Sequence, residues 1–450
     1  MSKNVYFHID ELGRDAITAS ALKKAFAERG INLVYGNRVY TRRVLEHFVF
    51  AFDIIILPRP MFLHDFKNMN KDMPPIVVVF TESVGRVVDE NNDKFTLFSL
   101  LDTPYMEGDT KYVDKVTSFF LWGESGKTRI DKYYPEIADK FHVVGHPRHD
   151  KRCIDHKIKN TSKAKAKIGL ITRQPLLNDF LKRQPVEAVV ASSSSLEVSY
   201  DYNNTSTGDF LLSQDNDPVD EIYMEAVDIQ ILLQLLLKLN EQGHEIHLKV
   251  HPREDRELWV DFVKKYNLNV TLAHWCMPFS HWVKELDYVI GPSSTSFYDC
   301  CVAGVQPICT RRINKNRDFH INEFSEEYGA LMEHIVTPDS INEIVEIVSE
   351  KNESFELSDE IKQVLLNETN YPDSNNSIDK MVELSLASKK EDQVSPFMKT
   401  IYMISFNIYG GLLDNAMRIY RFLNRRTEQG STFLMTKKNR KYIDSLVDWH

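Results

Sequence analysis

Residues 53–58 read DIIILP and residues 76–80 read IVVVF, two short runs of apolar and mostly β-branched residues. A strand with one face in water alternates apolar and polar residues, and these two runs do not alternate. They therefore predict strands that are buried on both faces, as in a parallel sheet covered by helices. Pro58 ends the first run because proline cannot donate a hydrogen bond to a sheet ladder.

Similar runs continue on both sides of these two strands, with helix-like segments between them. Strands are predicted at 4–9, 32–36, 118–123 and 141–145, and helices at 21–30, 41–52 and around 127–134. Such alternation of strands and helices predicts a doubly wound α/β domain, which we place at residues 1–150.

A second α/β unit follows a polar, lysine-rich stretch at 151–167, which is typical of a linker. In this unit strands are predicted at 168–172, 245–250, 268–273, 286–291 and 306–310, with a long helix near 221–240. We place the second domain at 168–350. The predicted fold class is therefore α/β, with two Rossmann-like domains facing a cleft.

Residues 351–450 differ from the rest of the chain. A polar segment is followed by apolar residues at helical spacing, and then by clusters of Arg and Lys. These apolar positions are Phe397, Ile401, Ile404, Ile408 and Leu412. An amphipathic helix of this kind can lie on an anionic bilayer, which predicts peripheral membrane contact through residues 397–441. The alternative is a helix packed back on the N-terminal domain.

Composition restricts the class of protein. The chain has 450 residues, of which 42% are hydrophobic and 27% charged, as in ordinary globular proteins. Its net charge of −10 argues against a protein that coats nucleic acid. We expect no secretory signal and no membrane-spanning helix. Five cysteines without a CxxC motif fit a reducing cytoplasm. We therefore expect a cytoplasmic protein, which is either free in solution or bound at the inner face of the membrane.

The motif KVHPRE, residues 249–254, directly follows a predicted strand. His251 therefore lies at the carboxyl edge of a sheet, where α/β proteins bind ligands, and its imidazole can contact a phosphate or move a proton. Pro252 fixes the turn, and Lys249 and Arg253 add positive charge suited to phosphates. The alternative is a solvated turn.

A second motif, GPSSTS at 291–296, also follows a strand and precedes a predicted helix. Ser293, Ser294 and Thr295 would present hydroxyls and backbone N–H groups to an anion, with Asp299 one turn further on. The alternative is an ordinary helix cap. Arg173, at the end of another strand, is placed to bind a phosphate or a carboxylate.

Carboxylates follow strands in the first domain and precede a helix in the second. Asp10, Glu11 and Glu82 follow strands of the first domain and are candidates for the general base or acid, with helix capping as the alternative. Asp217 and Asp220 precede the long helix of the second domain, and Asp220 is a further catalytic candidate, with a carboxylate that only stabilises the helix N-terminus as the alternative.

A third motif and several missing ones complete the pattern. In GHPRHD, residues 145–150, Arg148 and Asp150 are predicted to hold the connection between the domains. The sequence lacks the dinucleotide GxGxxG motif, the P-loop, HExxH and GxSxG. We therefore expect no cofactor and no metal, with basic side chains and helix N-termini stabilising a leaving phosphate instead.

Taken together, Gly-x-Pro-Arg-x-Asp (145–150), Lys-x-His-Pro (249–252) and Ser-Ser with a later Asp (293–299) resemble GT-B enzymes of two groups. One comprises the bacterial surface-carbohydrate proteins, including the capsule and lipopolysaccharide Kdo transferases, and the other the CDP-glycerol glycerophosphotransferases. The resemblance implies that the C-terminal domain binds the nucleotide and that His251 contacts the donor phosphate. The implied partners are a nucleotide-activated sugar and a glycan or glycolipid acceptor. The Trp-His-Gly motif of the teichoic acid enzymes is missing.

Our first hypothesis is a glycosyltransferase that moves Kdo or a related acidic sugar from a CMP donor to a bacterial surface polysaccharide or glycolipid. The alternatives are a glycerophosphotransferase with a CDP donor, a non-catalytic scaffold of a glycan assembly complex and, more remotely, a UDP-sugar 2-epimerase.

Overall fold

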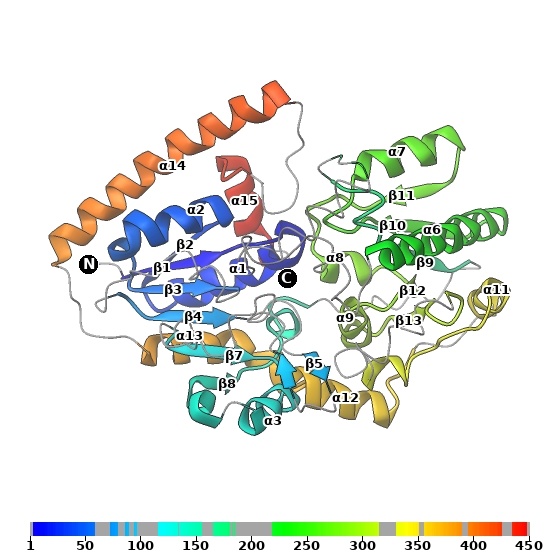
Figure 1. Ribbon diagram of the computed structural model, residues 1–450, viewed down its shortest axis with the longest axis horizontal. Helices are drawn as coiled ribbons and strands as arrows, with labels where there is room; N and C mark the ends of the chain where they lie inside the picture. Colours follow the sequence, from blue (N-terminus) through cyan, green and yellow to red (C-terminus); the bar gives the residue numbers. More distant parts are fainter. Residues whose placement is uncertain are drawn as a thin grey trace, which may run out of the picture.

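The fold is taken from a computed structural model of the chain. The structure describes residues 3–58, 73–79, 86–89, 94–96, 116–133, 135–154, 165–180, 182, 184, 218–314, 330–350, 355–388, 395–424 and 434–447. Within these residues, two separate parallel sheets dominate the molecule (Figure 1).

The first sheet has six parallel strands in the order β2-β1-β3-β4-β7-β8. Their bounds are β1 Lys3–His8, β2 Ile31–Gly36, β3 Ile54–Leu57, β4 Ile76–Val79, β7 Ser118–Leu121 and β8 Phe141–Val143. The strands β3 and β4 are buried at every position, as their continuous apolar runs predicted. A small antiparallel pair, β5 (Arg86–Asp89) and β6 (Lys94–Thr96), lies outside this sheet.

Helices and short turns connect the strands of the first sheet. In the described residues they are α1 Leu12–Ala27, α2 Arg38–Arg43, η1 Val44–Phe48, η2 Val49–Ala51, α3 Glu124–Tyr133 and η6 Pro135–Lys140, and the turn η7 Pro147–His149 follows β8. The helix α1 begins nine residues before its predicted start, because it is buried nearly all round and so shows no clear apolar period. The single helix predicted at 41–52 is wrong: a π turn, η1, and a 3-10 turn, η2, follow α2 there.

The second sheet has five parallel strands in the order β11-β10-β9-β12-β13. Their bounds are β9 Lys167–Ile171, β10 Glu245–Lys249, β11 Val270–Leu272, β12 Tyr288–Gly291 and β13 Gln306–Cys309. The helices of this unit are α6 Pro218–Glu241, α7 Arg256–Lys265, α8 Phe279–Val283, α9 Ser296–Ala303 and α11 Ile341–Ser349. Alternate residues of the strands enter two separate apolar clusters, so both faces of the sheet are covered.

After α11, the described part of the chain continues with α12 Asp359–Thr369, the 3-10 turn η8 Asp373–Asn376, α13 Ser377–Ala387, α14 Pro396–Asn424 and α15 Lys437–Ser445. Apolar residues of α13, α14 and α15 enter the core of the first sheet, so the end of the chain returns to its first unit (Figure 1). The polar composition of 352–394 did not predict α12 and α13.

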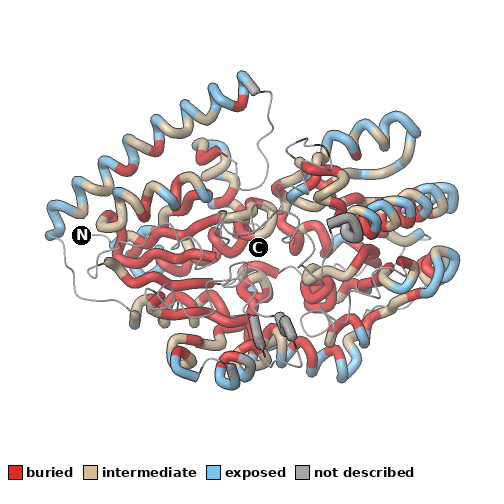
Figure 2. The backbone as a smooth tube through the Cα atoms, in the orientation of Figure 1, coloured by how far each residue is buried: buried red, intermediate tan, exposed pale blue. Residues whose placement is uncertain are grey.

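The predicted class is confirmed: an α/β chain with two parallel sheets and a helical C-terminal region. Figure 2 shows the strands of both sheets as the most continuously buried segments, with exposed residues concentrated on the outer helices. Because all strands of a sheet run the same way, the loops at their carboxyl ends gather at one edge, and this places the candidate site.

Candidate active site

A cavity of about 280 Å³ lies between the two units. The first unit contributes the start of α1 and η7. The second unit contributes the loops that follow β9, β10, β11 and β12. Its lining includes four Lys or Arg side chains, one histidine and one carboxylate: Arg14, Arg148, Arg173, Lys249, His251 and Glu11. In a chain with a net charge of −10, this local excess of positive charge favours an anionic ligand.

His251 and Lys249 enter the cavity from the loop after β10. The His251 Nδ1 atom accepts the backbone N–H of Arg253 at 3.2 Å, so the neutral ring carries its proton on Nε2, which can donate to a ligand. The Lys249 Nζ donates to the Met277 carbonyl at 2.7 Å. Desolvation lowers the pKa of Lys249 to about 8, so its ammonium group stays charged at neutral pH and can bind a phosphate.

The turn between β12 and α9 forms a further wall of the cavity, with Ser293, Ser294 and Thr295 among its lining residues. Ser294 Oγ accepts the N–H of Ser296 at 3.2 Å, which shapes the start of α9. Arg173 Nη1 donates to the Ser293 carbonyl at 2.9 Å, so the guanidinium lies against this turn. The helix N-terminus and the arginine together form an arrangement suited to a phosphate.

The first unit brings Glu11 and Arg14 to the opposite side. Arg14 contacts Asp10 at 3.1 Å and Asp15 at 2.8 Å, so Asp10 is already paired with a cation. Gly13 allows the two units to approach closely here, because a Cβ at this position would lie 2.9 Å from the carbonyl oxygen of Trp275. Among the described residues of the first unit, Glu11 is therefore the carboxylate that lines the cavity.

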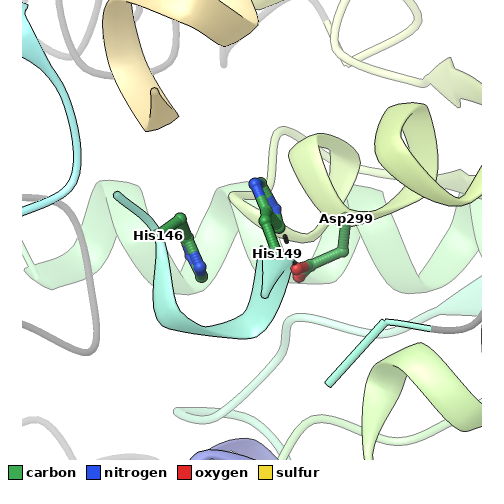
Figure 3. A group of neighbouring side chains, drawn as sticks. All are labelled: His146, His149 and Asp299. Atoms are coloured by element: carbon green, nitrogen blue, oxygen red, sulfur yellow. Dashed lines mark ion pairs between the residues drawn. The ribbon is translucent and has the colours of Figure 1, made fainter. Parts of the chain in front are cut away.

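Behind the cavity, three buried side chains from both units meet (Figure 3). His146 precedes the short turn η7, His149 is the last residue of that turn, and Asp299 belongs to α9. One ligating atom from each lies within 4.8 Å of the others. Asp299 forms an ion pair with Arg148 at 3.2 Å, and its Oδ1 lies 3.3 Å from the Nε2 atom of His149.

This cluster fits a contact between the units better than a metal site. The Arg148 backbone N–H lies 3.1 Å from His146 Nδ1 and the Arg148 guanidinium faces Nε2, and both groups can only donate. Whichever ring nitrogen lacks the proton, its lone pair is therefore directed at Arg148 and not at a metal. The Arg148 guanidinium lies 3.3 Å from that same Nε2 and already neutralises Asp299. The expectation of a reaction without a metal stays a prediction.

Most of the residues that were predicted to bind the donor line the cavity, whereas several other predicted site residues do not. The predicted residues that line the cavity are Glu11, Arg173, Lys249, His251, Pro252, Ser293, Ser294 and Thr295. Arg253 is exposed beside it, Asp10 is paired with Arg14, and Asp299 is buried behind the cavity. Asp220 lies in the first turn of α6, and its side chain is outside the described part of the chain, as are Glu82 and Asp217.

Sequence reasoning missed Arg14, Thr172, Trp275 and Phe279 as lining residues, and it gave Arg148 only a structural role. Arg14 follows the acidic turn at residues 10–11, and Thr172 directly precedes Arg173. The neighbouring site residues could therefore have indicated both of them from the sequence. Trp275 and Phe279 follow a three-residue strand, β11, whose end is poorly marked in the sequence.

No family model and no curated protein matches the sequence. Among solved structures, the UDP-GlcNAc 2-epimerase of Methanocaldococcus jannaschii in complex with UDP-GlcNAc and UDP is 12% identical, with a TM-score of 0.43 over 85% of this chain and 100% of that one. The wall teichoic acid polymerase TagF is 8% identical, with a TM-score of 0.45 over 90% of this chain and 89% of that one. S. aureus MnaA bound to UDP is 10% identical, with a TM-score of 0.38 over 79% of this chain and 100% of that one. At such TM-scores these similarities do not assign an activity.

Proposed function

We propose that the protein is a glycosyltransferase of the GT-B type that uses a nucleotide-activated sugar. The observation that carries this proposal is the cavity between the two units, with cationic side chains of both on its wall and the start of α9 beside them. Arg173, Lys249 and His251 would bind the phosphate of the donor, and the cytidine donor CMP-Kdo or a related CMP-linked acidic sugar is the first candidate. Arg14 and Arg148, each already paired with a carboxylate of the chain, would then line the part of the cavity that takes the sugar.

In the proposed reaction an acceptor hydroxyl attacks the anomeric carbon of the sugar. A new C–O bond forms there, and the bond from that carbon to the phosphate oxygen breaks. Glu11 accepts the hydroxyl proton, and the negative charge that develops on the leaving nucleotide is stabilised by Arg173, Lys249 and the His251 Nε2–H. The acceptor would be a growing bacterial surface polysaccharide or glycolipid.

The first test is a thermal-shift panel with CMP, CDP, UMP, UDP, GDP and ADP, because a ligand that binds the folded state raises its melting temperature. We expect the largest shift with CMP, and its loss in His251→Ala with the unliganded melting temperature unchanged. The variant Arg253→Ala serves as a control, since Arg253 belongs to the same loop but does not line the cavity. CDP as the preferred ligand would favour a glycerophosphotransferase, and a flat panel would favour a scaffold.

Membrane contact through residues 397–441 is part of the proposal. Within the described residues, no helix is both long and apolar enough to cross a bilayer. Between residues 400 and 417, however, each side chain that α14 exposes is uncharged, and Ile404, Ile408 and Leu412 are more than half exposed. Residues 395–450 carry nine Lys or Arg against four Asp or Glu in a chain of net charge −10. An apolar helix face with basic residues around it suits an anionic bilayer.

Sedimentation with lipid vesicles tests this contact. We expect the protein to bind vesicles of phosphatidylcholine mixed with phosphatidylglycerol more strongly than phosphatidylcholine alone. The double variant Ile404→Asp with Ile408→Asp should stay in the supernatant. The control Leu237→Asp places a new charge at an exposed apolar position of α6 and should bind like the wild type. Equal binding of all three proteins would refute the role of α14.

A further inference from the structure

Glu254 is a buried carboxylate next to the cavity that the proposed reaction does not use. Four groups donate hydrogen bonds to its two oxygens. Thr172 Oγ1 at 2.7 Å and the Gln174 backbone N–H at 2.8 Å reach Oε1. Trp259 Nε1 at 3.1 Å and Asn178 Nδ2 at 3.3 Å reach Oε2. Burial raises the pKa of Glu254 above its ordinary value, and the four hydrogen bonds act in the opposite direction by stabilising the ionised carboxylate.

The direction of the Thr172 hydrogen bond follows from its second partner. The backbone N–H of His251 lies 2.8 Å from Thr172 Oγ1, and an N–H group can only donate. The Thr172 oxygen therefore accepts from His251, and its single proton points to Glu254. This relay connects the buried carboxylate to the backbone of His251.

The same oxygen of Glu254 also fixes the position of Arg173. Its two partners on that side, Thr172 and Gln174, are the residues immediately before and after Arg173. Backbone bonds join the same two loops, since the N–H of Phe180 donates to Arg253 and the N–H of Asp255 donates to Asn178. The loops after β9 and β10 are thus held together around one carboxylate.

We propose that Glu254 is a positioning residue, which acts through Thr172 to hold His251 and Arg173 in the geometry that binds the phosphate of the ligand. The proposal rests on the proposed function for the identity of the ligand, and on the described contacts for everything else. A preorganised pair of this kind binds an anion without first having to order two loops.

Two variants test the relay. Thr172→Val keeps the shape of the side chain and removes the hydroxyl, and Glu254→Gln replaces one acceptor oxygen by an NH₂ group that faces other donors. The control is Thr310→Val, because Thr310 is equally buried and also directly follows a strand of the same sheet, but does not line the cavity. We expect both test variants to bind CMP about tenfold more weakly, the effect of one lost hydrogen bond, and the control to bind like the wild type.

Hydrogen–deuterium exchange separates positioning from general destabilisation. In the test variants the amides of 172–180 and 251–255 should exchange faster, while the strands of both sheets keep their protection. The proposal also makes a prediction for a background variant in which Arg173 and His251 are both alanine. Adding Thr172→Val to that background should not weaken CMP binding further, because the two residues through which Thr172 acts are already missing. The proposal would be overturned if both test variants kept the wild-type exchange rates in these loops and the wild-type affinity for CMP. Faster exchange throughout the second unit would overturn it as well. If the wild type binds no nucleotide, the proposed function fails, and the exchange data still decide the role of Glu254.

Discussion

At the scale of single residues, Lys249 makes the site sensitive to pH. Desolvation lowers the pKa of its ammonium group to about 8, so the group is charged at pH 7 and neutral at pH 9. A neutral amine loses its attraction for phosphate. We predict that the dissociation constant for CMP rises about tenfold between pH 7 and pH 9, as measured by calorimetry. The phosphate contributes little to this change because its own second pKa is near 6.

Two substitutions at the same position assign this effect to Lys249. Lys249→Met should bind CMP at pH 7 as weakly as the wild type does at pH 9, with no further change as the pH rises. Lys249→Arg keeps its charge throughout this range, so its affinity should not fall. If Lys249→Met retains the pH dependence of the wild type, another group causes it.

At the scale of elements, α14 has two faces with different roles. Phe406 is 2% exposed and lies within 5.4–6.5 Å, between ring centroids, of Tyr6, Tyr40, Phe48 and Phe52. The opposite face carries Ile408, which is 62% exposed. The first face anchors the helix on the first unit, and the second is the proposed membrane face.

This division predicts opposite results for two truncations. Phe406→Ala should lower the free energy of unfolding by about 3 kcal/mol, because it leaves a cavity among packed aromatic rings. Ile408→Ala should change it by less than about 0.5 kcal/mol, since the side chain is mostly in water. Urea denaturation measures both values. Vesicle binding should weaken in Ile408→Ala, whose fold is intact, and a large loss of stability there would contradict the division.

The strand ends of the second unit could be predicted from the sequence, and the first unit's part in the site mostly could not. Continuous β-branched runs predicted the strands, and the parallel order then brought Arg173, His251 and Ser293 to one edge. Arg14 and Arg148 reach the cavity because of how the two units meet, as at Gly13 and Trp275, and this is a tertiary contact without a local signal. The alternative interpretation of α14, a helix packed on the first unit, is confirmed by Phe406, and membrane contact through the other face stays a prediction.

At the scale of the whole molecule, the contact between η7 and α9 predicts a loss of stability in acid. Burial lowers the pKa of both His146 and His149, so the folded protein keeps these rings neutral. In the unfolded chain a histidine has a pKa near 6.5. Below that pH the unfolded chain binds protons that the folded protein does not, so the free energy of unfolding falls as the pH falls, by at most about 1.4 kcal/mol per histidine and pH unit.

His146→Asn isolates one of the two contributions. An asparagine oxygen can accept the Arg148 N–H as Asn37 already accepts N–H groups at the start of α2, and asparagine does not titrate. At pH 8 the variant should be less stable than the wild type, because the ring contact with Trp122, 4.0 Å between centroids, is lost. Between pH 7 and pH 5 its melting temperature should fall less steeply than that of the wild type. His47→Asn, which removes a histidine from the surface instead, is the matched control, and equal slopes in all three proteins would show that the acid sensitivity arises elsewhere.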